Sequence, residues 1–424
     1  MLASESGAVQ VVKLLLKEGA NPNRLDSDGK SALATAIKGM NLQVVQALVD
    51  AGVSVNHLHD TTNGDGSDTG ETPLYRAIVA DDLAIVEYLL DKGANPNVSG
   101  DALLLPFERA CCDEATDIGR ALVKSKGFDL QGISANSQLG SAVHCSLLTN
   151  NVDIMELLLD SGAPVDVVAQ PLGSPLHVVA DMSVDIRPED VRRAFKRLVQ
   201  KGSKIDEGDF GGRTALSLLL SISPTIDIEY LLDDLGASPD VPDQNNITPL
   251  HYAAMASTVE NLRKLLEKTS DVTVVDKWGR GVLYRAALSN EVTKFEAVLE
   301  KLPQDCVQKQ LASAIHPAVA RGGAYIVEII LGLSASDLNG PDRNGWTPYE
   351  IATVYGHHEL QSRLLPKMES QPQPQPMART GPTDKVKPSK WSVEELTASV
   401  QLSEDGTVAS ICGECPSFPP SPTT

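Results

Sequence analysis

Apolar residues recur along the chain at helical spacing, in short stretches that end at a glycine. The clearest example is VVKLLLKEGANPN at residues 11–23, and IVEYLLDKGANPN at residues 85–97 is almost the same phrase. The predicted apolar face of the first stretch comprises Val11, Val12, Leu14, Leu15 and Leu16. This spacing predicts an amphipathic helix. Gly19 supplies a left-handed stop, and Pro22 keeps the chain from continuing as a helix.

The stretches repeat with a period of 32 to 41 residues. The closing glycines are Gly19, Gly52, Gly93, Gly127, Gly162, Gly202 and Gly236. Beyond them an apolar pair keeps the period at Leu265–Leu266, Val298–Leu299, Ile330–Leu331 and Leu364–Leu365. The two longest steps predict insertions at residues 61–68 and around residues 183–190. A sustained period of this size is the signature of a repeat array.

A further helix is predicted before each of these stretches. In TPLHYAA at residues 248–254, Thr248 can cap the helix with its hydroxyl group. Pro249 takes the first helical position, where a missing N–H group is harmless. The same start recurs at residues 72–74, 174–176 and 347–349. Each unit therefore predicts a helix, a turn, a second helix and an extended loop.

These units resemble the ankyrin repeat, whose pattern is D-x-x-G-x-T-P-L-H-x-A-A followed by V-x-x-L-L-x-x-G-A-x-x-N. The resemblance covers about residues 1–366 and is strongest in residues 26–56, 70–97 and 342–360. It implies an all-α solenoid of stacked helix-turn-helix units with extended loops. We count a partial first repeat and about ten units, the last serving as a C-terminal cap. One helix pair cannot bury its own apolar face, so stacked neighbours must supply the core.

The character of the sequence changes after residue 366. Residues 367–390 form a Pro- and Gln-rich linker, in which QPQPQP favours extended geometry. In the tail, residues 391–424, Trp391 and LSEDG at residues 402–406 resemble the start of a SPRY domain. Too few residues follow to complete such a sandwich, and prolines are frequent. We therefore expect the tail to be mostly disordered.

Composition narrows the class of function. The 424 residues carry 36 basic and 56 acidic side chains, and the net charge of −20 disfavours nucleic acid and anionic membranes as partners. Six cysteines without a disulfide framework indicate a reducing compartment. We expect a cytoplasmic protein, with the nucleus as a second location. The N-terminus lacks the pattern of a signal peptide, and no feature encodes a symmetric interface, so a monomer is expected.

The residues that could carry chemistry have structural explanations. His144, His177 and His251 recur at equivalent repeat positions, and the resemblance implies that they hydrogen-bond neighbouring loops rather than bind a metal ion. Cys412 and Cys415 form a C-x-x-C motif without a second ligand pair or a helix N-terminus beside it. We find no nucleophile–base pair and no phosphate-binding loop. The sequence therefore predicts no catalytic residue, no cofactor, no metal and no enzyme activity.

Large side chains occupy positions that the ankyrin pattern leaves free. In that family, loop tips and first helices normally carry the partner contacts, so the resemblance implies a concave protein-binding surface. The candidate partner-binding residues are Phe210, Arg213, Lys277, Trp278, Arg280, Arg343, Trp346 and Tyr355. Aromatic and Arg side chains dominate the energetics of interfaces. The alternative is that Trp278 and Trp346 only cover the edge of the next repeat.

The predicted function is that of a non-catalytic scaffold or adaptor that binds a protein partner. Two alternatives stay open. The chain is a fragment of a larger ankyrin–SPRY or receptor-like signalling protein, or it is the regulatory part of an enzyme whose catalytic domain is missing. The partner cannot be named from the sequence, because recognition depends on side chains carried by a common frame.

Overall fold

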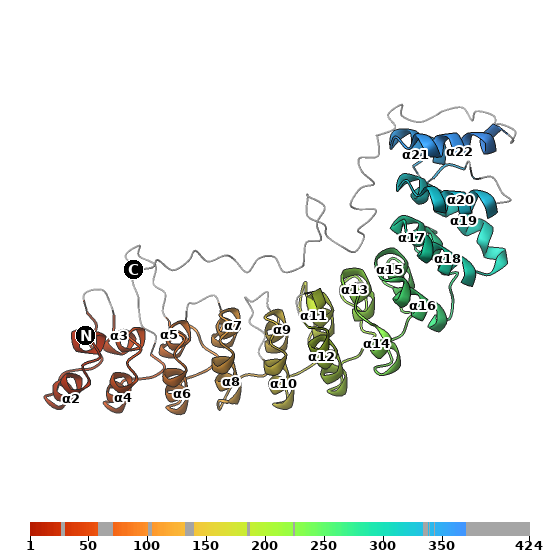
Figure 1. Ribbon diagram of the computed structural model, residues 1–424. Coiled ribbons are helices and arrows are strands. Elements are labelled where there is room, and N and C mark those ends of the chain that lie inside the picture. Colours follow the sequence, from red (N-terminus) through yellow and green to blue (C-terminus); the bar gives the residue numbers. More distant parts are fainter. Residues whose placement is uncertain are drawn as a thin grey trace. The chain divides into compact units, whose positions relative to one another are not determined.

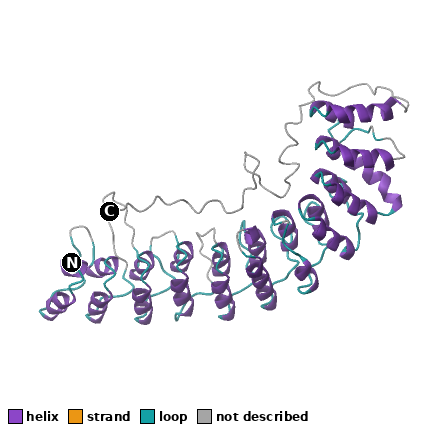
Figure 2. Ribbon diagram, viewed as in Figure 1, coloured by secondary structure: helices purple, strands orange, loops and turns teal. Residues whose placement is uncertain are grey.

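The computed structural model of the protein consists of helix pairs joined by loops (Figure 1). The residues that the structure describes are 1–26, 30–57, 71–100, 104–131, 140–184, 187–223, 225–333, 338, 340–342 and 344–369. Within these ranges every named element is a helix, and β-pairing is limited to isolated bridges (Figure 2). The predicted all-α fold is therefore confirmed. The insertion at residues 61–68 and the chain from residue 370 lie outside the described residues.

The chain divides into two compact units, the first ending at Lys204 and the second beginning at Ile205. The helices of the first unit are α1 (Leu2–Glu5), α2 (Val9–Lys17), α3 (Ala32–Lys38), α4 (Leu42–Asp50), α5 (Pro73–Val79), α6 (Leu83–Asp91), α7 (Pro106–Cys112), α8 (Thr116–Lys124), α9 (Ala142–Leu148), α10 (Val152–Asp160), α11 (Pro175–Asp181), the 3-10 helix η1 (Met182–Val184) and α12 (Pro188–Gln200). The helices of the second unit are α13 (Ala215–Ile222), α14 (Glu229–Asp233), α15 (Pro249–Ala256), α16 (Val259–Lys268), α17 (Val282–Ser289), α18 (Val292–Lys301), α19 (Gln304–Ala320), α20 (Ala324–Leu333), α21 (Pro348–Val354) and α22 (His358–Glu369).

Within each unit, corresponding helices of successive pairs stack on one another. In the second unit α13, α15, α17, α19 and α21 contact each other in series, and α16, α18, α20 and α22 form a parallel series (Figure 1). The first unit repeats this arrangement, with α3, α5, α7, α9 and α11 in one row. Each helix pair therefore completes its core against its neighbours. None of the described helices is both long enough and apolar enough to cross a membrane.

The predicted helix starts are confirmed by their hydrogen bonds. The Thr72 hydroxyl accepts a 3.1 Å hydrogen bond from the Tyr75 N–H group, and Pro73 follows as the first helical residue. At the start of α15 the bonds run to a side chain instead: the Thr248 N–H group donates to His251 Nδ1 at 3.2 Å, and the Thr248 hydroxyl lies 2.9 Å from the same atom. A Leu then follows the capping residue by two positions, and Leu74 and Leu250 are both almost fully buried. Local capping chemistry thus fixes where each helix begins, and its apolar face fixes how the helix packs.

The first helix pair differs from the sequence prediction. Of the five residues predicted to form the apolar face of α2, only Val12 is buried, and Val11 and Leu15 are each 48% exposed. Their counterparts one repeat later, Val44 and Leu48, are buried because α2 packs against α4. No described helix covers Val11 and Leu15 in the same way. The amphipathic pattern specifies a helix, and the neighbour determines whether that helix is buried.

Two repeats depart from the common geometry. The second predicted insertion contributes to a longer helix at its end, since α12 begins at Pro188 and has 13 residues whereas α10 has 9. In the repeat after residue 301, helix replaces the extended loop that joins the other repeats. The helix α19 starts only two residues after α18 and runs for 17 residues. Its side chain Gln310 lies against Gly281, where an added Cβ atom would be 2.6 Å from the Gln310 amide oxygen.

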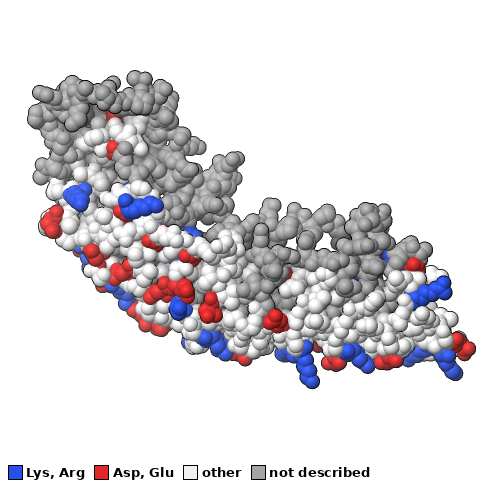
Figure 3. All heavy atoms as spheres, turned by 180° about the vertical axis from the view of Figure 1, so that it is seen from behind, with Lys and Arg blue, Asp and Glu red and all other residues white. Residues whose placement is uncertain are grey.

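Ion pairs join consecutive second helices. Between α10 and α12, Arg197 contacts Asp160 at 2.6 Å and Glu156 at 3.7 Å, and Lys201 contacts Asp160 at 3.0 Å. Arg193 adds contacts to Asp153 and Glu156. On the face shown in Figure 3, side chains of opposite charge lie side by side in the same way. Such part-exposed pairs contribute little individually, but a network links two repeats.

Replacing both Arg193 and Arg197 with methionine should lower the free energy of unfolding by about 1 kcal/mol at low ionic strength. The loss should shrink as NaCl is added, because salt already screens these part-exposed charges in the unmodified protein. Thermal unfolding of the variant and of the unmodified protein across a NaCl series measures this loss of stability. Lys196→Met, an exposed position on the same helix, is the control. A loss that does not depend on salt would mean that the arginine stems, rather than their charges, stabilise α12.

Candidate functional site

Three loops of the second unit share one hydrogen-bonded geometry, and we call them finger 1 (residues 209–213), finger 2 (243–247) and finger 3 (276–280). Each begins with an aspartate whose Oδ1 atom accepts the N–H groups two and four residues later. In finger 3 these are Trp278 and Arg280, both at 2.9 Å from Asp276 Oδ1. In finger 1, Asp209 Oδ1 accepts from Gly211 at 2.8 Å and from Arg213 at 2.9 Å. The aspartate therefore folds the loop around itself.

The fourth residue of each finger adopts a left-handed backbone conformation. It is Gly212 with φ of 79° in finger 1, Asn246 with φ of 60° in finger 2 and Gly279 with φ of 77° in finger 3. Glycine and asparagine are the residues that tolerate this region. At Gly212 there is also no room for a side chain, because a Cβ atom would lie 2.9 Å from the Gln244 nitrogen. The D-x-x-G pattern of the sequence is thus a requirement of the backbone.

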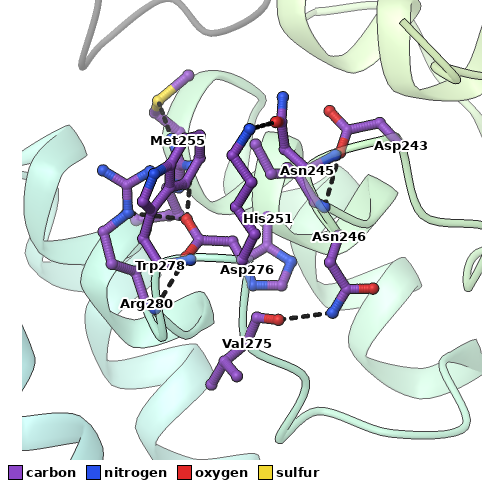
Figure 4. Close-up of polar contacts among 12 residues, drawn as sticks. Asp243, Asn245, Asn246, His251, Met255, Val275, Asp276, Trp278 and Arg280 are labelled. Carbon is purple, nitrogen blue, oxygen red and sulfur yellow. Dashed lines mark hydrogen bonds and ion pairs between the residues drawn. The ribbon is translucent and has the colours of Figure 1, made fainter.

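Hydrogen bonds join the three fingers into a ladder. Gln244 N–H donates to the Gly211 carbonyl at 3.0 Å, and Lys277 N–H donates to the Asn245 carbonyl at 2.8 Å. Side chains add to it, since the Asn246 amide donates to the Val275 carbonyl at 2.7 Å (Figure 4). Because each finger is held by its own aspartate and by its neighbour, the three tips form one ordered surface.

Finger 3 carries the densest group of charges. The Asp276 side chain is fully buried, and its Oδ2 atom accepts a hydrogen bond from Arg280 Nε at 2.8 Å (Figure 4). The same atom accepts a hydrogen bond from Arg285 Nη2 at 3.1 Å. The residue Arg285, on α17, is itself buried. Burial and the like charge of Arg280 lower the pKa of Arg285. One carboxylate therefore balances two guanidinium groups.

Trp278 lies between cations at the tip of finger 3. Arg280 Cζ is 4.3 Å from the centroid of the indole ring, and Lys277 Nζ is 4.4 Å from it. Lys277 also donates to the Asn245 side chain, which fixes its position across two fingers. The ring is half-buried and the lysine is exposed. The electron-rich face of the indole favours both cations.

The other predicted residues occupy different environments. Phe210, at the tip of finger 1, is 46% exposed. Arg213 is largely buried and pairs with Asp209 at 2.7 Å. Trp346 closes a fourth loop, where its N–H group donates to Asp342 Oδ1 at 2.8 Å, and Arg343 lies outside the described residues. Tyr355 follows α21 at its C-terminal end and stacks on His357.

The structure thus brings five of the eight predicted residues together in one ladder, namely Phe210, Arg213, Lys277, Trp278 and Arg280. Tyr355 is separated from them, because it lies at the C-terminal end of α21, whereas each finger precedes the N-terminal end of a helix. Sequence reasoning missed Arg285. A signal existed, since Arg285 follows Asp276 by nine residues, as Tyr252 follows Asp243, and the Tyr252 hydroxyl donates to Asp243 Oδ2 at 2.9 Å.

His144 has the structural role that the resemblance implied, because it joins its own helix start to the next loop. His144 Nδ1 accepts a hydrogen bond from the Ser141 N–H group at 3.2 Å, and its Nε2 atom lies 3.1 Å from the Gly173 carbonyl in the next loop. His251 contacts Thr248 in the same way. Burial lowers the pKa of His144 to about 4. Burial, reinforced by the charge of Arg285, lowers the pKa of His251 to about 4.

The described part of the chain holds free cysteines but no cluster of metal ligands. The described residues contain no group of three or more His, Cys, Asp and Glu side chains that could hold a metal ion. Within the same ranges Cys111, Cys112, Cys145 and Cys306 are free thiols. Cys412 and Cys415, which form the C-x-x-C motif, lie outside them. The finger ladder of the second unit is therefore the best-defined candidate site in the described part of the chain.

Comparison with known proteins supports the repeat assignment. A family model described as ankyrin repeats (3 copies) matches residues 1–99, 176–276 and 223–310, which together make up more than half of the chain. Relatives include transient receptor potential cation channel subfamily A member 1 of Homo sapiens, 23% identical over 376 residues, and E3 ubiquitin-protein ligase KEG of Arabidopsis thaliana, 24% identical over 293 residues. These matches cover 86% and 68% of this chain but only 32% and 18% of the relatives.

Solved structures with similar folds include the human ASB11 ankyrin repeat domain and the ankyrin repeat domain of Bcl-3. The first is 25% identical, covers 56% of this chain and 97% of its own, and has a TM-score of 0.42. The second is 24% identical, covers 57% and 100%, and has a TM-score of 0.43. The family match does not extend to Trp391 and residues 402–406, so the SPRY-like segment stays a prediction. With more than half of its residues matched, and with helix pairs repeated along its described part, the chain belongs to the ankyrin repeat family.

Proposed function

We propose that this chain is a non-catalytic adaptor that binds a protein partner through the finger ladder of its second unit. Ankyrin repeat domains generally mediate protein–protein interaction. The observation that carries the proposal is Trp278, which lies between Lys277 and Arg280 on a loop that is hydrogen-bonded to its neighbour. Trp and Arg side chains held in such a way are the residues that dominate interface energetics.

The order of the ladder supports the same proposal. A partner that binds a flexible loop must offset the entropy lost when the loop becomes ordered. Fingers 1 to 3 are already ordered by their aspartates and by the hydrogen bonds between Gln244 and Gly211 and between Lys277 and Asn245. Phe210 adds an exposed aromatic side chain at the other end of the ladder. Rigid scaffolds of this kind make good recognition surfaces.

The rest of the proposal concerns the setting in which binding occurs. The net charge of −20 favours a protein over nucleic acid or an anionic membrane as partner. We propose a monomer in the cytoplasm, with the nucleus as a second location, because the cysteines indicate reducing conditions. The alternative, a segment of a larger signalling protein, is supported by the length of the relatives, of which this chain spans about a third or less.

Replacing Trp278 with alanine should weaken binding of the partner by about 2 kcal/mol, or roughly 30-fold in Kd. Partners are first identified by affinity purification of the unmodified chain, and each Kd is then measured with both proteins. Tyr325→Ala is a suitable control, because Tyr325 is 73% exposed on α20 and belongs to no finger. A variant that melts at a lower temperature yet binds every partner unchanged would show that Trp278 is edge packing.

A further inference from the structure

The acidic side chains of the fingers are directed inward and are occupied. Asp276 accepts four hydrogen bonds, from Trp278, Arg280 and Arg285. The Asp209 and Asp243 carboxylates are likewise enclosed by their own loops. A carboxylate offers about four acceptor positions, so Asp276 has none left for a partner. Although the chain as a whole is strongly acidic, the ladder cannot present these charges outward.

The tips of the fingers carry other chemistry. Finger 1 presents Phe210 and Gly211, finger 2 presents Gln244 and Asn245, and finger 3 presents Lys277 and Trp278. These tip positions are apolar, amide or cationic, and none is acidic. Phe210, Gln244 and Lys277 are exposed. The charge that the finger tips offer to a partner is therefore positive, whereas the net charge of the whole chain is negative.

Positive charge is in excess at finger 3. The single Asp276 carboxylate faces both Arg280 and Arg285, while Lys277 bonds to the neutral Asn245 side chain. Arg280 donates its Nε–H group to Asp276, and its side chain is only 9% exposed, so Lys277 is the exposed cation of finger 3. His251, beneath the finger (Figure 4), is neutral at physiological pH and adds no charge. A negative group placed beside Trp278 would balance this excess at short range.

Building on the proposed function, we infer that the partner presents an acidic peptide segment, in which a carboxylate side chain contacts the exposed Lys277 while a neighbouring apolar side chain covers Trp278 or Phe210. The indole ring supplies apolar area, and the cations beside it supply the preference for negative charge. The Asn245 and Gln244 amides lie between the two aromatic tips and can bond to the peptide backbone. A basic segment would meet the exposed Lys277, with Arg280 buried behind it, and no accessible finger carboxylate.

A random dodecapeptide library displayed on phage tests this inference with the full chain as bait. Clones that also bind the Trp278→Ala chain are removed. The remaining peptides should be rich in Asp and Glu next to aromatic or aliphatic residues. A labelled peptide from this set should bind about 10-fold more weakly to Lys277→Gln and still more weakly to Lys277→Glu. Lys301→Gln, an exposed charge change on α18, should leave its Kd within about twofold.

A charge exchange gives a second, independent readout. Replacing the essential acidic residue of the peptide with lysine should abolish binding to the unmodified chain and restore at least part of it with Lys277→Glu. Peptides that depend on Trp278 but are rich in Lys and Arg, or are indifferent to Lys277, would overturn this inference and leave the proposed function intact. If no clone remained after that removal, and none of the removed clones lost binding to a Phe210→Ala chain, the proposed function itself would fail.

Discussion

Replacing Asp276 with asparagine should lower the free energy of unfolding of this protein by about 3–5 kcal/mol. The substitution keeps an oxygen for the N–H groups of Trp278 and Arg280 but removes the charge that balances Arg280 and Arg285. The Asp276 side chain is fully buried, and the side chain of Arg285 is only 6% exposed. An unpaired cation in that environment is costly because water cannot replace the lost carboxylate. Urea unfolding followed by circular dichroism measures the effect.

The other fingers provide matched controls for this prediction. Asp209→Asn removes the same group beside one arginine, Arg213, which is 16% exposed, so a loss of about 1–2 kcal/mol is expected. Asp243 Oδ2 accepts from the neutral Tyr252 hydroxyl, so Asp243→Asn should lower the free energy of unfolding by less than about 1 kcal/mol. Adding Arg285→Met to Asp276→Asn should recover part of the stability, since it removes the stranded charge. Equal losses at all three aspartates would contradict a charge effect and point to loop geometry alone.

Lowering the pH from 7 to 5 should destabilise the protein through its buried histidines. Burial holds the pKa of His144 and His251 at about 4, and it also lowers the pKa of His316. In the unfolded chain a histidine has a pKa of about 6.5. Below that value the unfolded state binds more protons than the folded state, so stability falls as the pH falls. For His144 and for His251 the loss approaches about 1.4 kcal/mol per pH unit and ends near pH 4, at about 3 kcal/mol each.

The contribution of one histidine can be isolated with a glutamine substitution. Glutamine can complete the capping box with Thr248 but does not titrate, so His251→Gln should be less sensitive to pH between 7 and 5 by about 2 kcal/mol. His358→Gln, at an exposed position of α22, serves as the control. Keeping the pH at 5 or above avoids protonation of carboxylates. If His251→Gln lost stability with the same slope as the unmodified chain, protonation of His251 would not be the cause.

The sequence by itself determined the elements that depend on neighbouring residues. Helix starts at Thr72 and Thr248 follow from a hydroxyl that bonds three residues ahead and a proline that tolerates the first turn. The finger loops follow equally from Asp209, Asp243 and Asp276, each of which bonds two and four residues ahead. Because these bonds span only a few residues, local composition is enough to specify them. These helix starts and loops recur about every 33 residues, and that period identified the repeat and its all-α fold.

Only the tertiary structure decided which of these residues are exposed and which are paired. Val11 and Val44 have the same place in the pattern, yet one is 48% exposed and the other is fully buried, because α2 covers α4. Arg280 and Lys277 look alike in the sequence, but Arg280 is drawn inward by Asp276 and Lys277 extends to Asn245 of the preceding finger. Burial and long-range pairing depend on the neighbouring repeat, which lies about 33 residues away in the sequence. A pattern of a few adjacent residues does not specify these contacts.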